Sequence, residues 1–180
     1  MRGAVLLLAL LGAALVLFSG SALAQEGSLP DLTVDKTGPS TATPDEFVTY
    51  SIDTTNVGFG DAFLPSGAVL LRDEVISNAG KITGLSANSG LPVGTTPSSG
   101  FSTQQASGTK RMSFSVEFYK GDSTDTTIFP GGGLLQTGVG VDTKASGGHI
   151  INCATADPDN VIVESDEANN TDCVTTKIVP

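Results

Sequence analysis

The chain has 180 residues, with 9 Lys and Arg against 19 Asp and Glu, which gives a formal net charge of -10 at pH 7. Nucleic acids and anionic membranes are bound by clustered basic side chains, so this charge argues against both kinds of partner. A hydrophobic content of 39% is enough for a globular core, and the length suits one domain.

The N-terminal segment predicts export. A positively charged start precedes an apolar run over residues 4–18, and Ala22 and Ala24 then provide the small side chains that signal peptidase accepts. An uncleaved membrane anchor is the alternative, but the apolar run is short for a membrane span. We therefore expect a signal peptide over residues 1–24, followed by a mature domain over residues 25–180 that has no membrane span and is secreted or held at the cell surface.

The mature sequence predicts strands and turns, because no stretch repeats its apolar residues at helical spacing for three turns. Apolar and polar residues alternate in several segments, which Gly, Pro and Asn separate. The expected strands lie at residues 32–36, 48–52, 69–75, 112–118, 135–141, 150–155 and 173–179. Residues 86–109 are rich in Ser, Gly and Thr, and we interpret them as a long connection. The pattern predicts an all-β fold, a single antiparallel immunoglobulin-like β-sandwich of about seven to nine strands.

The two cysteines predict a disulfide. Cys153 and Cys173 are the only cysteines of the chain, and such a pair in an exported protein is normally oxidised. Their midpoint in the sequence is Val163, so they fall where paired positions of an antiparallel hairpin should lie. A catalytic cysteine would need a histidine partner, for which His149 is the sole candidate, and we favour the structural disulfide.

Both ends of the mature sequence resemble a known family of bacterial modules. The string LPDLTV at residues 29–34, followed by Tyr50 and by Asn-Val-Gly at residues 56–58, resembles the start of a CARDB domain, the cell adhesion related domain found in bacteria. Residues 156–171, with their acid-rich loop and paired Asn, are similar to the closing hairpin of that family. Residues 32–54 also resemble repeat domains of large bacterial surface proteins. The resemblance implies an extracytoplasmic β-sandwich used for adhesion or display, and not an enzyme.

The acid-rich loop suggests a calcium site as one of two interpretations. Oxygen ligands at this density suit Ca²⁺, and the candidate ligands are Asp157, Asp159, Glu164 and Asp166. The spacing of an EF-hand is missing, because the sixth position from Asp157 is Ile162 and the twelfth is Ala168. The other interpretation, which we favour, is a solvated hairpin whose Asp and Asn side chains bond the nearby backbone. No other cofactor is expected.

Three polar residues share the alternation of the core residues in their strands. They are Lys36, Asp73 and Asn152, from an early, a middle and a late strand. This arrangement resembles the intramolecular Lys–Asn isopeptide bonds of bacterial surface sandwiches, which a buried carboxylic acid promotes. The resemblance implies that Lys36 is the nucleophile, Asn152 supplies the amide and Asp73 is the acid. In the ordinary alternative, the Lys36 ammonium reaches water at the end of its strand, and Asp73 makes a salt bridge or caps a turn.

These observations together predict a secreted, non-catalytic adhesion or structural module of a bacterial cell surface. Its expected partners are other cell-surface or matrix proteins, or further copies of itself. An alternative function is a subunit of an extracellular filament or matrix that assembles through strand edges. A secreted hydrolase is a weaker alternative, because the chain has no Gly-x-Ser-x-Gly motif and a single His.

Overall fold

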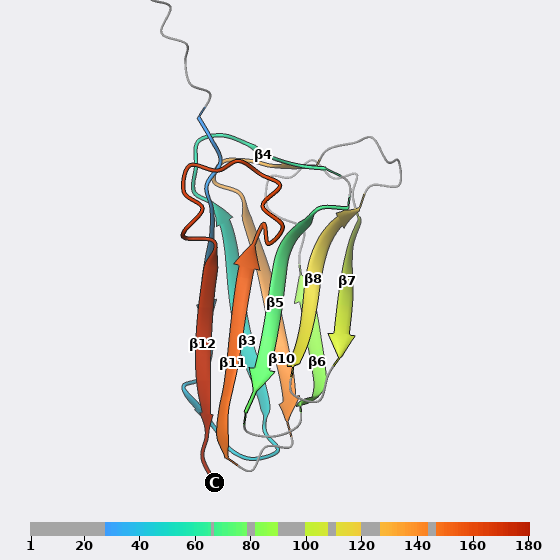
Figure 1. Cartoon of the computed structure of the whole chain (residues 1–180), viewed down its shortest axis with the longest axis vertical. Helices are drawn as coiled ribbons and strands as arrows, with labels where there is room; N and C mark the ends of the chain where they lie inside the picture. The colour runs from blue at the N-terminus through green and yellow to red at the C-terminus, as the bar shows by residue number, and fades with distance from the viewer. Residues whose placement is uncertain are drawn as a thin grey trace, which may run out of the picture.

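The computed structural model describes residues 28–65, 67–78, 82–89, 100–107, 111–119, 127–143 and 147–180. These ranges contain strands, turns and bends but no helix, and so no helix that could cross a membrane (Figure 1). The predicted signal peptide over residues 1–24, with its cleavage site at Ala22 and Ala24, lies outside the described residues.

The described part of the chain forms twelve strands. They are β1 (Leu32–Thr37), β2 (Thr41–Ala42), β3 (Phe47–Asn56), β4 (Ala62–Leu64), β5 (Val69–Ser77), β6 (Ile82–Ser89), β7 (Gly100–Ser107), β8 (Arg111–Tyr119), β9 (Thr127–Phe129), β10 (Leu134–Thr143), β11 (Gly148–Ala156) and β12 (Thr171–Ile178). Nine of these strands have six residues or more, which agrees with the expected seven to nine strands.

The strands form two facing sheets. One sheet has four strands in the order β1-β3-β10-β6, and the other has six in the order β2-β12-β11-β5-β8-β7. Figure 1 shows the six-stranded sheet in front of the four-stranded sheet. All neighbours are antiparallel except β2 and β12, and the short strands β4 and β9 pair separately. The predicted all-β sandwich is confirmed.

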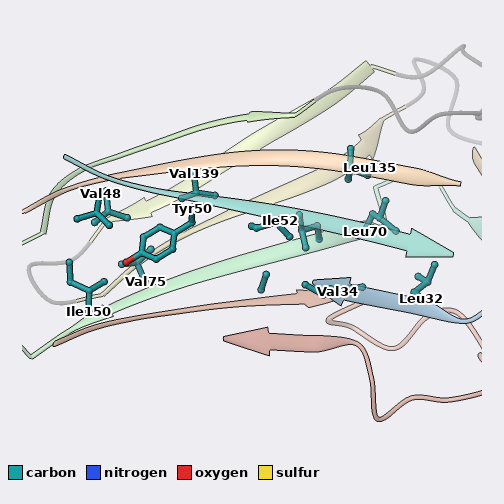
Figure 2. Packing of buried hydrophobic residues seen from close by; sticks show 14 of the residues in the cluster. Leu32, Val34, Val48, Tyr50, Ile52, Leu70, Val75, Leu135, Val139 and Ile150 are labelled. Carbon is teal, nitrogen blue, oxygen red and sulfur yellow. The ribbon is translucent and has the colours of Figure 1, made fainter. Parts of the chain in front are cut away.

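Alternating side chains build the core between the sheets. In β3 the side chains of Val48, Tyr50 and Ile52 are buried, whereas Thr49 and Ser51 are exposed. The pleat of a strand sends successive side chains to opposite faces, so this sequence buries one face of β3 (Figure 2). Burial of each large apolar side chain contributes about 1.5–3 kcal/mol.

The prediction of a long connection over residues 86–109 is wrong. Strand β6 ends at Ser89 and β7 spans Gly100–Ser107, so much of this segment belongs to the sheets. The two strands lie at the edges of their sheets and carry sequences rich in Ser, Thr, Gly and Gln. Backbone hydrogen bonds to one neighbour define an edge strand, and those bonds require no alternation of apolar side chains.

Candidate functional site

Lys36 lies near the end of β1 and belongs to its buried face. Leu32, Val34 and Lys36 are buried, while Asp35 and Thr37 between and after them are exposed. The side chain of Lys36 has no exposed surface. The structure thus places Lys36 on the core face that its alternation predicts, and its ammonium does not reach solvent as in the ordinary alternative.

Asp73 contacts Lys36 from the opposite sheet. The Nζ atom of Lys36 lies 2.6 Å from Oδ1 of Asp73, and the Asp73 side chain also has no exposed surface. Because β1 belongs to the four-stranded sheet and β5 to the six-stranded sheet, this ion pair crosses the interior of the sandwich. Burying two charges costs several kcal/mol per ion in desolvation, which their attraction offsets only with good geometry and further hydrogen bonds.

Asn152 completes a cluster that we call the buried triad, which consists of Lys36, Asp73 and Asn152. In the register between β5 and β11, Asn152 lies opposite Val75 and Ala154 lies opposite Asp73. Asn152 and Asp73 are therefore diagonal neighbours on the core face, and both are fully buried.

The hydrogen bonding of the triad is incomplete. Neither Nδ2 nor Oδ1 of Asn152 has a hydrogen-bond partner, and Oδ2 of Asp73 has none either. Buried polar atoms nearly always have partners, and leaving one unpaired costs about 1–3 kcal/mol. Three such atoms on two neighbouring residues lower the stability of the fold, so stability alone does not explain why the triad has these residues.

Burial also shifts the protonation of the triad. It lowers the pKa of Lys36 and raises the pKa of Asp73, because each side chain loses the water that stabilises its charged form. Their mutual attraction opposes both pKa shifts, and the nearby Asn152 amide favours ionised Asp73. Burial of both side chains thus favours a neutral amine beside a carboxylic acid, whereas their attraction favours the ion pair.

The ring of Tyr50 lies close to the Lys36 amine. The Nζ atom lies 5.5 Å from the centroid of that ring. The Tyr50 hydroxyl donates to Oγ1 of Thr176 at 2.8 Å, because the Thr176 hydroxyl itself donates to the carbonyl oxygen of Pro39 at 2.7 Å. The ring can lie there only because residue 38 is Gly, since a Cβ atom would lie 2.3 Å from Cδ1 of Tyr50.

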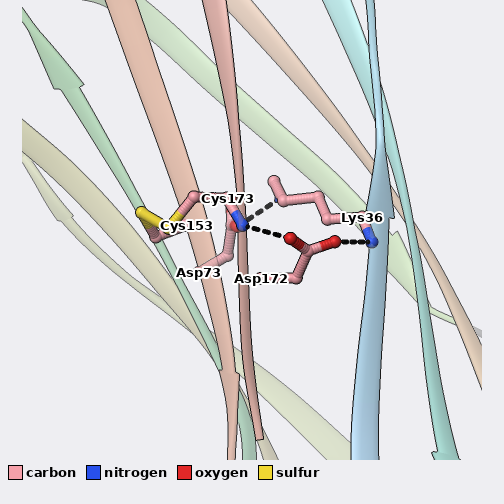
Figure 3. A network of polar contacts seen from close by, with 5 residues as sticks. All are labelled: Lys36, Asp73, Cys153, Asp172 and Cys173. Carbon is pink, nitrogen blue, oxygen red and sulfur yellow. Dashed lines mark hydrogen bonds and ion pairs between the residues drawn. A yellow bond between two sulfur atoms is a disulfide. The ribbon is translucent and has the colours of Figure 1, made fainter. Parts of the chain in front are cut away.

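The predicted disulfide joins β11 to β12. Cys153 and Cys173 lie directly opposite each other in the register and are bonded. Next to the disulfide, Oδ2 of Asp172 accepts the backbone N–H of Lys36 at 2.8 Å (Figure 3). Asp172, which precedes Cys173 in β12, thus connects the disulfide-bonded strand to the strand that carries the triad lysine. Because Cys153 is oxidised, it is not a nucleophile activated by His149.

The acidic side chains of the hairpin loop bond separate groups. The Asp157 carboxylate accepts the backbone N–H of Ile162 at 2.7 Å, and the Asp166 carboxylate accepts the backbone N–H of Ala168 at 2.9 Å. Asp159 pairs with Arg72 at 3.0 Å. Within the described ranges, no group of three or more His, Cys, Asp or Glu side chains is placed to hold a metal ion. Calcium binding by this loop stays the alternative interpretation, beside the favoured solvated hairpin.

Glu164 is, like Asp157, a buried carboxylate of the same loop. Its Oε2 accepts the backbone N–H of Leu32 at the start of β1, and its Oε1 accepts Nδ2 of Asn170 at 2.9 Å. Burial raises the pKa of Glu164 from 4.5 to about 7. Glu164 was one of the candidate calcium ligands, and no local pattern of the sequence signals its burial, because the apolar Val163 beside it is exposed.

A group of exposed apolar side chains lies on the loops at the end of the sandwich that is uppermost in Figure 1. Backbone hydrogen bonds hold these loops together, including Gly60 N–H to the Leu29 carbonyl at 3.2 Å and Ser165 N–H to the Pro30 carbonyl at 2.9 Å. The exposed side chains, which we call the apolar loop surface, are Leu29, Val57, Phe59, Val161 and Val163. Sequence analysis missed this surface because its residues come from three separate segments.

No protein-family model and no curated protein matches the sequence. Among solved structures, the chain is similar to the CARDB domain of the PF1109 protein from Pyrococcus furiosus. The crystal structure of that domain, in complex with di-metal ions, has 20% identity and a TM-score of 0.43, with 84% of this chain and 90% of that chain covered. A solution structure of the same domain has the same identity and TM-score and covers 96% of that chain.

A further similar structure is AvmM, which catalyses macrocyclization in alchivemycin A biosynthesis. It has 13% identity and a TM-score of 0.45, with 83% of this chain and 89% of that chain covered.

Proposed function

We propose that this protein is a secreted, non-catalytic adhesion or structural module of a bacterial cell surface, which binds other surface or matrix proteins. The observation that carries the proposal is the apolar loop surface, where 94% of Phe59 and 73% of Val163 are exposed. Exposed apolar side chains that gather on neighbouring loops are typical of protein-binding sites. Backbone hydrogen bonds join the loops that carry these side chains, so the end of the sandwich presents them to a partner in a fixed arrangement.

Export is supported by two independent features. The N-terminal sequence has the charge, apolar run and small residues of a signal peptide. The disulfide between Cys153 and Cys173 suits an oxidising compartment outside the cytoplasm.

The absence of catalysis is supported by the closure of the buried triad. The side chains of Lys36 and Asp73 have no exposed surface, and Asn152 is fully buried. An external substrate would have no path to these groups without opening the core. The other candidate nucleophile, Cys153, is held in the disulfide.

Cell fractionation of the native host tests the proposal. We expect the wild-type protein to remain with the cell envelope, and a Phe59→Ser/Val163→Ser variant to move to the culture medium. The matched control is Phe47→Ser, because Phe47 is also exposed but begins β3, away from the loops that form the apolar surface. Equal retention of the wild-type protein and the double variant would contradict binding through this surface.

A second function, assembly into a filament or matrix, is favoured by the strand edges. Strands β6 and β7 lie at the edges of the two sheets, and neither carries a charged residue or a proline. Charges and prolines are what normally prevent edge strands from pairing with another chain. We expect a Thr103→Lys change in β7 to reduce self-association in sedimentation experiments. A protein that stays monomeric at every concentration would argue against assembly.

A further inference from the structure

We propose that Lys36 and Asn152 become joined by an intramolecular isopeptide bond between Nζ of Lys36 and Cγ of Asn152, with Asp73 transferring protons. The product would link β1 of the four-stranded sheet covalently to β11 of the six-stranded sheet.

The first support is that Asp73 contacts the amine and neighbours the residue that carries the amide. Its Oδ1 lies 2.6 Å from Nζ of Lys36, and Asn152 is its diagonal neighbour on the next strand. The second oxygen, Oδ2, has no hydrogen-bond partner. One carboxyl group therefore contacts the amine and retains an unpaired oxygen for the amide.

The second support is the unpaired Asn152 amide itself. Asn152 is fully buried, and both polar atoms of its side chain lack partners. A site that serves packing alone would be more stable with an apolar side chain of similar size, because unpaired buried polar atoms are costly. Reaction releases Nδ2 from the core and replaces a buried amine and amide with one secondary amide.

The third support is the chemistry of the buried pair. A neutral amine is a nucleophile, whereas an ammonium is not, and burial lowers the pKa of Lys36. Burial also raises the pKa of Asp73, so that its carboxylic acid form can donate a hydrogen bond to the amide oxygen and polarise the carbonyl. Both effects require the water-free interior in which these side chains lie.

The reaction balances without an oxidant or another reactant. Nζ attacks Cγ, so that the Nζ–Cγ bond forms and the Cγ–Nδ2 bond breaks. One proton leaves Nζ and one reaches Nδ2, both through the Asp73 carboxyl group, which ends in its starting protonation state. The leaving group is one molecule of ammonia.

Peptide mapping of the exported wild-type protein tests the proposal directly. Trypsin does not cleave after a lysine whose Nζ is acylated, so cleavage after Lys36 should be lost. After reduction of the disulfide, we expect a branched product in which residues 25–72 are joined to residues 145–177, lighter than the sum of these two peptides by one ammonia.

Intact mass alone is insufficient, because an N-terminal Gln25 can also cyclise with loss of one ammonia. Fragmentation of the branched peptide resolves this, since it assigns the link to Lys36 and Asn152. Asp73→Asn should abolish the branch and restore cleavage after Lys36. Asp35→Asn is the matched control, because Asp35 adjoins Lys36 but is exposed, and it should retain the branch.

Two results overturn the proposal. Complete cleavage after Lys36 in the wild-type protein, with a free peptide over residues 145–177, would show that no bond forms. A branch that joins Lys36 to Asp73 would show that the carboxyl group is the electrophile and that Asn152 is not. Since both readouts use the wild-type protein, neither depends on whether the Asp73→Asn variant folds.

Discussion

Replacing Glu164 by Gln should make the protein less sensitive to pH. Glu164 is 7% exposed, and its carboxyl oxygens accept the backbone N–H of Leu32 and Nδ2 of Asn170. Gln has almost the same shape but carries no charge. Its Oε1 can accept the Leu32 N–H, while its Nε2 can donate to Oδ1 of Asn170, which has no partner in the wild-type protein.

The sign of the effect follows from the raised pKa. Burial raises the pKa of Glu164 from 4.5 to about 7, so between these pH values the folded chain keeps a proton that the unfolded chain has released. The free energy of unfolding therefore falls as the pH rises through this window, and the loss is complete above about pH 7.

The magnitude follows from the same pKa difference. The change from 4.5 to about 7 would correspond to about 3 kcal/mol if it were fully expressed. Glu164 lies in a surface loop, where solvent screens part of this cost, so we expect about 1–3 kcal/mol. The Glu164→Gln variant should match the wild-type stability near pH 4.5 and exceed it by this amount at pH 8.

Urea unfolding at several pH values from 4.5 to 8, in buffers with a chelator, measures the difference between the two proteins. Effects of other titrating groups cancel because both proteins share them. Asp35→Asn is the control, since it removes one carboxylate charge from an exposed position of β1. Parallel curves for the wild-type protein and Glu164→Gln, or a gap that closes as the pH rises, would refute the reasoning.

Three further predictions concern export, the disulfide and the metal. The exported protein should begin at Gln25, which N-terminal sequencing checks, and a retained Met1 would contradict the cleavage site. Thiol titration of the unfolded, unreduced protein should find no free thiol, and Cys153→Ser/Cys173→Ser should lower the free energy of unfolding by about 3 kcal/mol, because the bridge closes a loop of 20 residues. Since the carboxylates of the loop bond separate groups, the melting temperature should be the same in chelator and in millimolar calcium, and a rise with calcium would support the ligands Asp157, Asp159, Glu164 and Asp166.

The sandwich and the buried triad could be predicted because alternation is a local property of the sequence. Leu32, Val34 and Lys36 occupy every second position, so the apolar pair fixes the face of the lysine. The cysteines were predictable for a similar reason, because an equal number of residues on each side of Val163 places them opposite each other.

The features that were missed depend on contacts between distant segments. Strand β7 is rich in Ser, Gln and Gly and is defined by its pairing with β8. Its own sequence does not predict that pairing. Burial of Glu164 depends on the backbone N–H of Leu32, which is 132 residues away. No local pattern contains that information.

The two sides of the sandwich differ in whether acidic side chains bond the backbone of the edge strand. Strand β1 pairs with β3 on one side only. On its open side, Asp172 accepts the N–H of Lys36, and Glu164 accepts the N–H of Leu32. Carboxylates of the closing hairpin thus occupy donors that would otherwise be available to a strand of another chain.

Strands β6 and β7, at the other side, have no charged residue. Pairing between copies should therefore use the edges of β6 and β7, while β1 stays attached to its own hairpin. A cross-link between Lys36 and Asn152 would strengthen that attachment, because it joins β1 to β11, and the disulfide already joins β11 to β12. A load applied to β1 and β12 would then be carried by the covalent bonds that join β1, β11 and β12. The edges of β6 and β7 would remain free to pair with another copy.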